Sequence, residues 1–194
     1  IDTDGDGVGN NADTDDDNDG VEDSLDLSPL AASENLDHDG DGVPALEATF
    51  RDPNALASDK EGNIFVADTA NNLIRKIDTK GIVTTFAGNG EHADSGDGGS
   101  ALEAAIRSMD DIEFSPEGEL HILGTNTHKV RKITKDGKIL TVAGKGYAGF
   151  FGDDGPAINA MLKNPAAISF DSKGNMHTAD MGNHRIRKLN NKGI

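Results

Sequence analysis

Residues 44–194 of this chain repeat with a period of 56 residues. The period is marked by residues that recur at equal spacing in three copies: Gly62, Gly118 and Gly174; Arg75, Arg131 and Arg187; Lys76, Lys132 and Lys188; Gly81, Gly137 and Gly193. A fixed period of this length indicates a repeat architecture, in which each unit buries its apolar surface against its neighbours. The fold must therefore be built by placing copies of one small unit side by side.

Each copy divides into short β-strands. In the first copy, β-branched and aromatic residues gather in 56–58, 64–67, 73–77 and 83–86, and turn pairs such as Glu61-Gly62 and Lys80-Gly81 separate them. Four strands per unit at a fixed period are typical of β-propeller blades, and the β-branched runs exclude a solenoid of helices. The sequence predicts an all-β fold with three four-stranded blades, at 53–87, 109–143 and 165–194, the last one incomplete.

The segments that join the copies also repeat. GDGGSALEAAIR (96–107) matches GDDGPAINAMLK (152–163), and GDGVPALEATFR (40–51) stands two periods before the latter. We expect such a segment, for example 101–106, to form a short helical turn between blades. Three blades cannot close a ring and would leave sheet edges and core open, so we interpret the chain as a fragment of a longer protein.

The strand motifs resemble the NHL repeat family. The residues that carry the resemblance are IFVADTANNLIRKI (64–77), ILGTNTHKVRKI (122–133) and HTADMGNHRIRKL (177–189). The resemblance covers residues 44–194 and implies a propeller, which has six blades in most members of that family. The middle copy departs from the pattern, because Gly124 stands where the other copies have Asp68 and Asp180.

A strongly acidic string precedes the repeats. The chain has 35 acidic and 18 basic residues, a net charge of −17, and residues 1–43 hold 13 Asp and 2 Glu without any Lys or Arg. Like charges at this density repel one another. The segment that carries them can therefore become ordered only if it binds cations. A solvated acidic tail is the alternative, and the spacing of the acids favours a cation-binding segment.

That spacing matches a calcium loop. From Asp2, oxygen ligands fall at positions 1, 3, 5, 9 and 12 of a 12-residue loop, with Gly7 at position 6 and the Val8 carbonyl at position 7. The pattern recurs 13 residues later with Gly20 at position 6. Oxygen ligands suit a hard cation such as Ca²⁺, and these loops offer none of the sulfur or nitrogen ligands that zinc prefers. The predicted ligands are Asp2, Asp4, Asp6, Val8, Asn10 and Asp13 in the first loop, and Asp15, Asp17, Asp19, Val21, Asp23 and Asp26 in the second.

A third, partial loop follows. It supplies Asp37, Asp39 and Asp41, which we also predict to be calcium ligands, but positions 9 and 12 are Ala45 and Ala48. Alanine side chains cannot ligate, so this half-loop either borrows ligands from a neighbouring loop or is merely solvated, and both interpretations stay open. Its Gly40–Gly42 stretch also begins the first joining segment.

The acidic string resembles thrombospondin type 3 repeats, calcium-wrapped strings of secreted proteins. The matching stretches are DTDGDGVGNNAD (2–13) and DTDDDNDGVED (13–23, continuing to 26). One residue separates the two loops, which leaves no room for the helices of an EF-hand. The chain has no Cys, so disulfides are excluded, and Cys-free strings of this kind are similar to those of bacterial surface proteins. The resemblance implies a secreted or cell-surface location.

Residues that recur with the period are expected to hold each blade together. Asp68, Asp180 and the three repeated arginines belong to this group, since repeat units share packing roles first. The histidines offer an alternative, because His121 and His177 are one period apart, as are His128 and His184. If these imidazoles faced the propeller channel they could bind a metal, as in a metal-dependent lyase or hydrolase. Otherwise they replace Phe65 at a packing position and Asn72 at a turn position.

The leading functional prediction is a calcium-binding extracellular spacer that presents the propeller to a protein or glycan ligand, or for adhesion. The alternatives are the propeller enzyme and a scaffold for protein or nucleic-acid partners. Acidity argues against nucleic acid, although Lys129, Arg131, Lys132, Lys135 and Lys138 form a local basic run. No apolar run in this chain approaches the ~18 residues that span a bilayer.

Overall fold

The computed structural model describes residues 43–190 and 193. These residues form three antiparallel sheets in chain order. The first sheet contains β1 (Val43–Pro44), β2 (Pro53–Ser58), β3 (Ile64–Asp68), β4 (Leu73–Ile77) and β5 (Ile82–Ala87); the second contains β6 (Asp111–Phe114), β7 (Leu120–Gly124), β8 (Lys129–Ile133) and β9 (Ile139–Ala143); the third contains β10 (Ala167–Phe170), β11 (Met176–Asp180) and β12 (Arg185–Leu189). Single 3₁₀ turns lie at η1 (Thr69–Asn71), η2 (Ala157–Asn159) and η3 (Met181–Asn183). In this part of the chain, no helix has the length and apolarity needed to cross a membrane.

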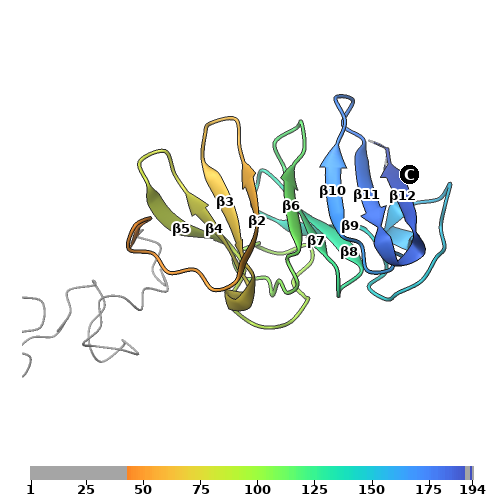
Figure 1. Cartoon of the computed structure of the whole chain (residues 1–194), viewed down its shortest axis with the longest axis horizontal. Coiled ribbons are helices and arrows are strands. Elements are labelled where there is room, and N and C mark those ends of the chain that lie inside the picture. Colours follow the sequence, from red (N-terminus) through yellow and green to blue (C-terminus); the bar gives the residue numbers. More distant parts are fainter. Residues whose placement is uncertain (1–42, 191–192, 194) are drawn as a thin grey trace, which may run out of the picture.

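The three sheets stand in a row as propeller blades (Figure 1). Strand β6 lies between β2 and β10, so that the first strand of each blade lines one side of the row. The tips of the β2–β3, β6–β7 and β10–β11 hairpins all point to the same side, at the top of Figure 1. The arrangement confirms the predicted all-β fold, a partial propeller of about three blades.

The strands of the first copy lie where the sequence predicts them, and Gly62 and Gly81 take positive φ angles of 90° and 83° in the predicted turns. The joining segments differ partly from the expectation. Residues 101–103 form a turn without helix, whereas the equivalent residues of the third copy form η2. Strand β1 was not predicted; it adds to the edge of β5 through Val43↔Val83 and Pro44↔Ile82.

Hydrophobic side chains of neighbouring sheets pack together and form the core. The cluster shared by the first two blades includes Phe65, Ile74, Met109, Ile112, Ile122 and Ile139. The cluster shared by the second and third includes Leu123, Val130, Ile168 and Met176. A repeated hydrogen bond also links the blades, in which a threonine hydroxyl donates to a backbone carbonyl of the next blade: Thr69 to Met109 O at 3.1 Å and Thr125 to Pro165 O at 2.8 Å.

The two ends of the row expose positions that are buried inside it. Ile74 and Val130 are fully buried, but their equivalent Ile186 in the third blade is 71% exposed. At the other end Leu56 is 68% exposed, while its equivalent Ile112 is buried. Burial at these positions therefore depends on an adjacent blade rather than on the blade that carries the residue.

This dependence predicts different costs for one substitution at two equivalent sites. Ile74→Ala should destabilise the chain by about 2–5 kcal/mol, because it removes buried methyl groups and leaves a cavity. Ile186→Ala should change stability by less than about 0.5 kcal/mol, as exposed substitutions usually do. Denaturant unfolding of both variants measures the two values. Equal costs would show that the exposed face of the third blade is covered in solution.

Candidate ligand-binding cleft

The predicted calcium ligands lie outside the described residues. They are Asp2, Asp4, Asp6, Val8, Asn10, Asp13, Asp15, Asp17, Asp19, Val21, Asp23, Asp26, Asp37, Asp39 and Asp41, and they stay a prediction from the sequence. Within 43–190 and 193, no three His, Cys, Asp or Glu side chains gather in a group that could hold a metal ion. Among the described residues, the candidate site is a cleft on the propeller.

The repeated aspartates stabilise the turn after the second strand of the blade. Asp68 is fully buried, and its Oδ1 accepts a hydrogen bond from the backbone N–H of Arg51 at 2.7 Å. Its Oδ2 accepts one from the Asn71 side chain at 2.8 Å. The third blade repeats both bonds with Asp180, Lys163 and Asn183. These carboxylates satisfy buried donors, and the expected structural role fits this geometry.

In the middle blade, different residues stabilise the turn after the second strand. A Cβ at Gly124 would overlap the Thr127 hydroxyl, so no aspartate fits there. Instead, Asp110 Oδ2 accepts hydrogen bonds from the Thr125 N–H at 2.8 Å and the Ser108 hydroxyl at 2.7 Å. The carboxylate has thus moved from the blade's second strand to the segment before its first strand.

Four members of the basic run pair with acidic residues of the chain. The pairs are Lys129–Asp94 at 2.7 Å, Arg131–Asp97 at 2.7 Å, Lys132–Glu119 at 2.6 Å and Lys138–Asp136 at 3.2 Å. Burial opposes ionisation of Asp97, but the hydrogen bond from Thr141 and the charge of Arg131 outweigh it and lower the pKa of that carboxyl. The run is therefore part of a balanced charge network and not a basic patch.

His121 occupies a packing position between blades. Its ring meets Phe170 edge to face at 4.7 Å, one period on from the contact between Phe65 and Phe114 at 4.9 Å. Its Nδ1 lies 3.1 Å from the Glu119 carbonyl, which fixes Nδ1–H as the donor. Burial lowers the pKa of this imidazole, so the ring is neutral where it packs.

The other repeated histidines have turn and surface positions. His128 and His184 adopt left-handed backbone conformations, with φ of 54° and 55°, as Asn72 does with φ of 58°. His128 Nδ1 accepts a hydrogen bond from the Asn164 N–H at 3.2 Å. His177 is half-exposed and lies 3.5 Å from an oxygen of Asp171. In this geometry the histidines replace Phe65 and Asn72 and do not meet at one centre.

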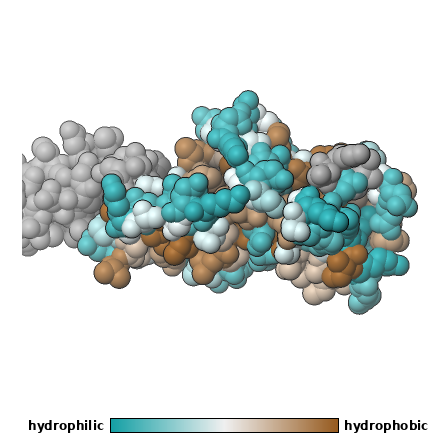
Figure 2. Space-filling view, turned by 90° about the horizontal axis from the view of Figure 1, so that it is seen from above, coloured by the Kyte–Doolittle hydropathy of each residue, from teal (hydrophilic) through white to brown (hydrophobic). Residues whose placement is uncertain are grey.

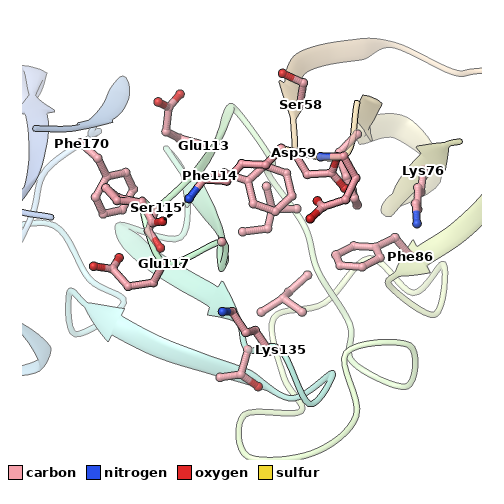
Figure 3. A pocket seen from close by; sticks show the side chains of 18 of the residues that line it. Ser58, Asp59, Lys76, Phe86, Glu113, Phe114, Ser115, Glu117, Lys135 and Phe170 are labelled. Carbon is pink, nitrogen blue, oxygen red and sulfur yellow. Dashed lines mark hydrogen bonds between the residues drawn. The ribbon is translucent and has the colours of Figure 1, made fainter. Parts of the chain in front are cut away.

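A cleft of about 750 Å³ opens at the hairpin tips. It runs from the first blade across the second to Phe170 at the end of β10. Phe65 forms its apolar floor with Phe86 and Phe114, whose ring centres lie 4.8 and 4.9 Å away in edge-to-face contacts. Figure 3 shows Phe86 and Phe114 directed into the same hollow, with Lys135 close by.

Charged residues line the cleft around this floor. The carboxylates are Asp59, Glu61, Glu113, Glu117 and Asp171, and the cations are Lys60, Lys76 and Lys135. The Lys60 ammonium donates to the Pro116 carbonyl at 2.8 Å and thereby ties the first hairpin tip to the second. Seen from above, the tip side is a mosaic of hydrophilic and hydrophobic residues (Figure 2).

Two acids of the cleft differ in how readily they take up a proton. Burial raises the pKa of Glu113, and the charge of Asp111 raises it further. Burial also opposes ionisation of Asp59, but hydrogen bonds from the Asn63 side chain and N–H outweigh this and lower its pKa. Asp59 is therefore ionised at neutral pH, and of the two acids Glu113 takes up a proton more easily.

The cleft residues were not predicted from the sequence. The sequence feature that indicates their location is a turn that recurs at one repeat position, at 59–62, 115–118 and 171–174. These three turns lie on the same side of the propeller. Loops held on a rigid scaffold commonly carry binding functions. The sequence does not show that Phe86 and Phe114 meet beneath these turns.

The amino-acid sequence matches a known protein family. Residues 30–98 and 97–190 match the model of the Teneurin NHL domain. Teneurin-m of Drosophila melanogaster is 29% identical over 163 residues, which cover 78% of this chain and 6% of that protein. Teneurin-3 of Mus musculus is 25% identical in an alignment 228 residues long that includes 77% of this chain and 8% of that protein. The chain thus spans less than a tenth of the length of these relatives.

A solved structure shows the same fold. A structural genomics protein of unknown function from Bacteroides thetaiotaomicron superposes with a TM-score of 0.58 at 23% identity. The superposition covers 66% of this chain and 32% of that one. This likeness concerns the fold alone and carries no statement about a ligand.

The packing of His121 predicts a pH-dependent effect of one substitution. The pKa of His121 in the folded chain lies below the ordinary 6.5, so the unfolded chain takes up the proton first as the pH falls. Stability is therefore lost as the pH drops through about 6.5. His121→Phe should remove this loss and restore the ring pair of the first blade, a contact worth about 0.5–1.5 kcal/mol.

Thermal unfolding at pH 7.5 and pH 5 tests this. The gain in melting temperature of His121→Phe over the wild type should be larger at pH 5. An equal gain at both values would contradict burial of a neutral imidazole.

Proposed function

We propose that the propeller binds another protein, at the surface of a cell or outside it, because this chain belongs to the teneurin NHL domain family. The observation that carries the proposal is the cleft at the hairpin tips, with an apolar floor and charged sides. Protein interfaces have this composition, an aromatic and apolar centre surrounded by polar and charged groups. Because the cleft crosses from one blade to the next, it also suits an extended segment better than a compact small molecule.

The charge pattern indicates what such a segment would contain. Phe86 and Phe114 offer a surface for an apolar or aromatic anchor. Lys135 and Asp59 on the walls would pair with charged groups of opposite sign on either side of that anchor. A peptide with a central aromatic residue and flanking charges fits both features.

Peptides selected from a random library on the purified chain test the site. Lys135→Glu should weaken binding of an acidic selected peptide by roughly tenfold, because it reverses one charge of the cleft. Lys138→Glu is the matched control, since Lys138 lies three residues away and does not line the cleft. Its affinity should stay within about twofold of the wild type. Equal affinities of all three proteins would place the peptide site elsewhere.

We further propose that residues 2–13 and 15–26 each bind one Ca²⁺ ion and form a spacer before the propeller. Their ligand spacing supports this, with Gly at position 6 and a backbone carbonyl donor at position 7 in both loops. The segment has few apolar residues, so bound ions would supply most of the free energy that orders it. Extracellular calcium sites commonly have dissociation constants of ~10⁻⁴–10⁻³ M.

Calcium titration of single variants tests the two loops. Asp13→Asn and Asp26→Asn remove the ligand at position 12 and should each eliminate about one bound ion. Asp16→Asn is the control, because Asp16 stands at the non-ligating position 2 of the second loop. Chelation should also make residues 1–42 of the wild type more sensitive to protease. Unchanged cleavage and unchanged stoichiometry in all variants would leave a solvated acidic tail.

A further inference from the structure

A second cavity, of about 440 Å³, lies between the second and third blades. It repeats the cleft at the hairpin tips one period later, because each residue of the aromatic floor has its equivalent in the lining of this cavity. The equivalent pairs are Phe65 and His121, Phe86 and Val142, and Phe114 and Phe170. Ser115 and Glu117 line both cavities, so the two adjoin. The candidate binding surface therefore continues from the first pair of blades to the second.

The exchange of phenylalanine for His121 places a hydrogen-bond acceptor in the second cavity. The ring keeps the edge-to-face contact with Phe170 and donates its Nδ1–H to the Glu119 carbonyl at 3.1 Å. Since burial keeps the imidazole neutral, its Nε2 carries a lone pair. Within 43–190 and 193, no hydrogen bond reaches this Nε2, although His121 is only 7% exposed. A buried acceptor of this kind is stabilised by a ligand that supplies a donor.

The charges around the second cavity also favour a ligand group that donates hydrogen bonds. Lys132 is the one cation among the described residues that line it, and its ammonium lies 2.6 Å from a Glu119 oxygen. Glu117 stands at the border between the two cavities. Hydrogen bonds from its own N–H and from the Ser115 hydroxyl hold the pKa of its carboxyl below the usual value. An anionic ligand group would therefore meet a carboxylate and a lone pair, both of which repel it.

The remaining walls of the second cavity are largely apolar. Val142, Ile158, Phe170, Met176 and Leu189 line it. A cationic side chain would lose water beside these walls, which is costly without a free carboxylate, and Glu119 is already paired. A tyrosine side chain has an apolar ring for such walls and a single donor at the tip of the ring. It matches a cavity whose acceptor, His121, takes the floor position of Phe65.

We propose that the second cavity is a further subsite of the binding surface, and that it takes a tyrosine side chain of the bound protein whose phenol O–H donates to His121 Nε2. The subsite rests on the proposed function, because the tyrosine belongs to the same extended segment whose anchor occupies the cleft at Phe86 and Phe114. Its ring packs against Phe170, which lines both cavities. The segment thus runs along the hairpin tips from the first blade to the third.

A double-mutant cycle between peptide and protein tests the contact. Peptides selected from a random library on the 194-residue chain should contain a tyrosine besides the aromatic anchor. Replacing that tyrosine by phenylalanine should weaken binding about three- to tenfold, the net effect of one hydrogen bond. In His121→Phe, which carries the residue of the first copy at this position, the same replacement should change affinity by less than about twofold. Titration calorimetry gives the four affinities, and equal losses in both proteins would overturn the assignment to His121.

Further variants separate failure of the subsite from failure of the proposed function. Lys135 lines the first cleft and not the second cavity. Peptides that respond to Lys135→Glu but contain no such tyrosine would leave the first cleft as the binding site and overturn the subsite. Peptides that carry lysine or arginine in its place, and lose affinity in Glu117→Gln, would show a cationic occupant and overturn it as well. A chain that selects no peptide would overturn the proposed function and the subsite together.

Discussion

The structure depends on the burial of each blade against the next. A single sheet of this size cannot bury both of its faces, so apolar residues from adjacent sheets share one cluster, as Ile74 does with Ile112. The threonine bonds from Thr69 and Thr125 to the following blade fix the contact between sheets at the same place in each pair. Where the row ends, Leu56 and Ile186 are exposed although their equivalents are buried. A residue at these positions is thus buried only where a neighbouring blade covers it.

Much of this architecture could be predicted from the sequence because the period reports it directly. The strands of the first copy and the turns at Gly62 and Gly81 follow from local pattern, since β-branched runs and glycine preferences act over a few residues. Strand β1 could not be predicted in this way, because its pairing with β5 joins residues about 40 positions apart and leaves no alternation in a two-residue strand. The presence of Gly124 in place of an aspartate shows a limit of prediction from the sequence. Asp110 compensates for the missing carboxylate, and this depends on three-dimensional proximity.

The candidate cleft was harder to predict for a related reason. Its floor combines Phe65, Phe86 and Phe114, which come from two blades and have no common spacing. Lys135 and Glu113 line it from the second blade, beside residues whose roles are structural. Repeated residues point to the scaffold and are easy to find, whereas a binding surface lies where the copies differ. The period therefore predicts the fold well and the site only through the side to which the hairpin tips point.

The ion pairs of the joining segments have a consequence for how such a protein can grow. The joining segments 96–107 and 152–163 bind the arginine of the blade that follows them, as Asp97 binds Arg131 and Asp153 binds Arg187. A 56-residue unit that begins at such a joining segment therefore carries both the arginine and the aspartate that pairs with it. Duplication or loss of such a unit would keep the Asp97–Arg131 type of pair within every unit, whereas the pair between Lys129 and Asp94 crosses the unit boundary. The number of blades can change in evolution, or by engineering, in steps of one unit without leaving a buried arginine uncompensated.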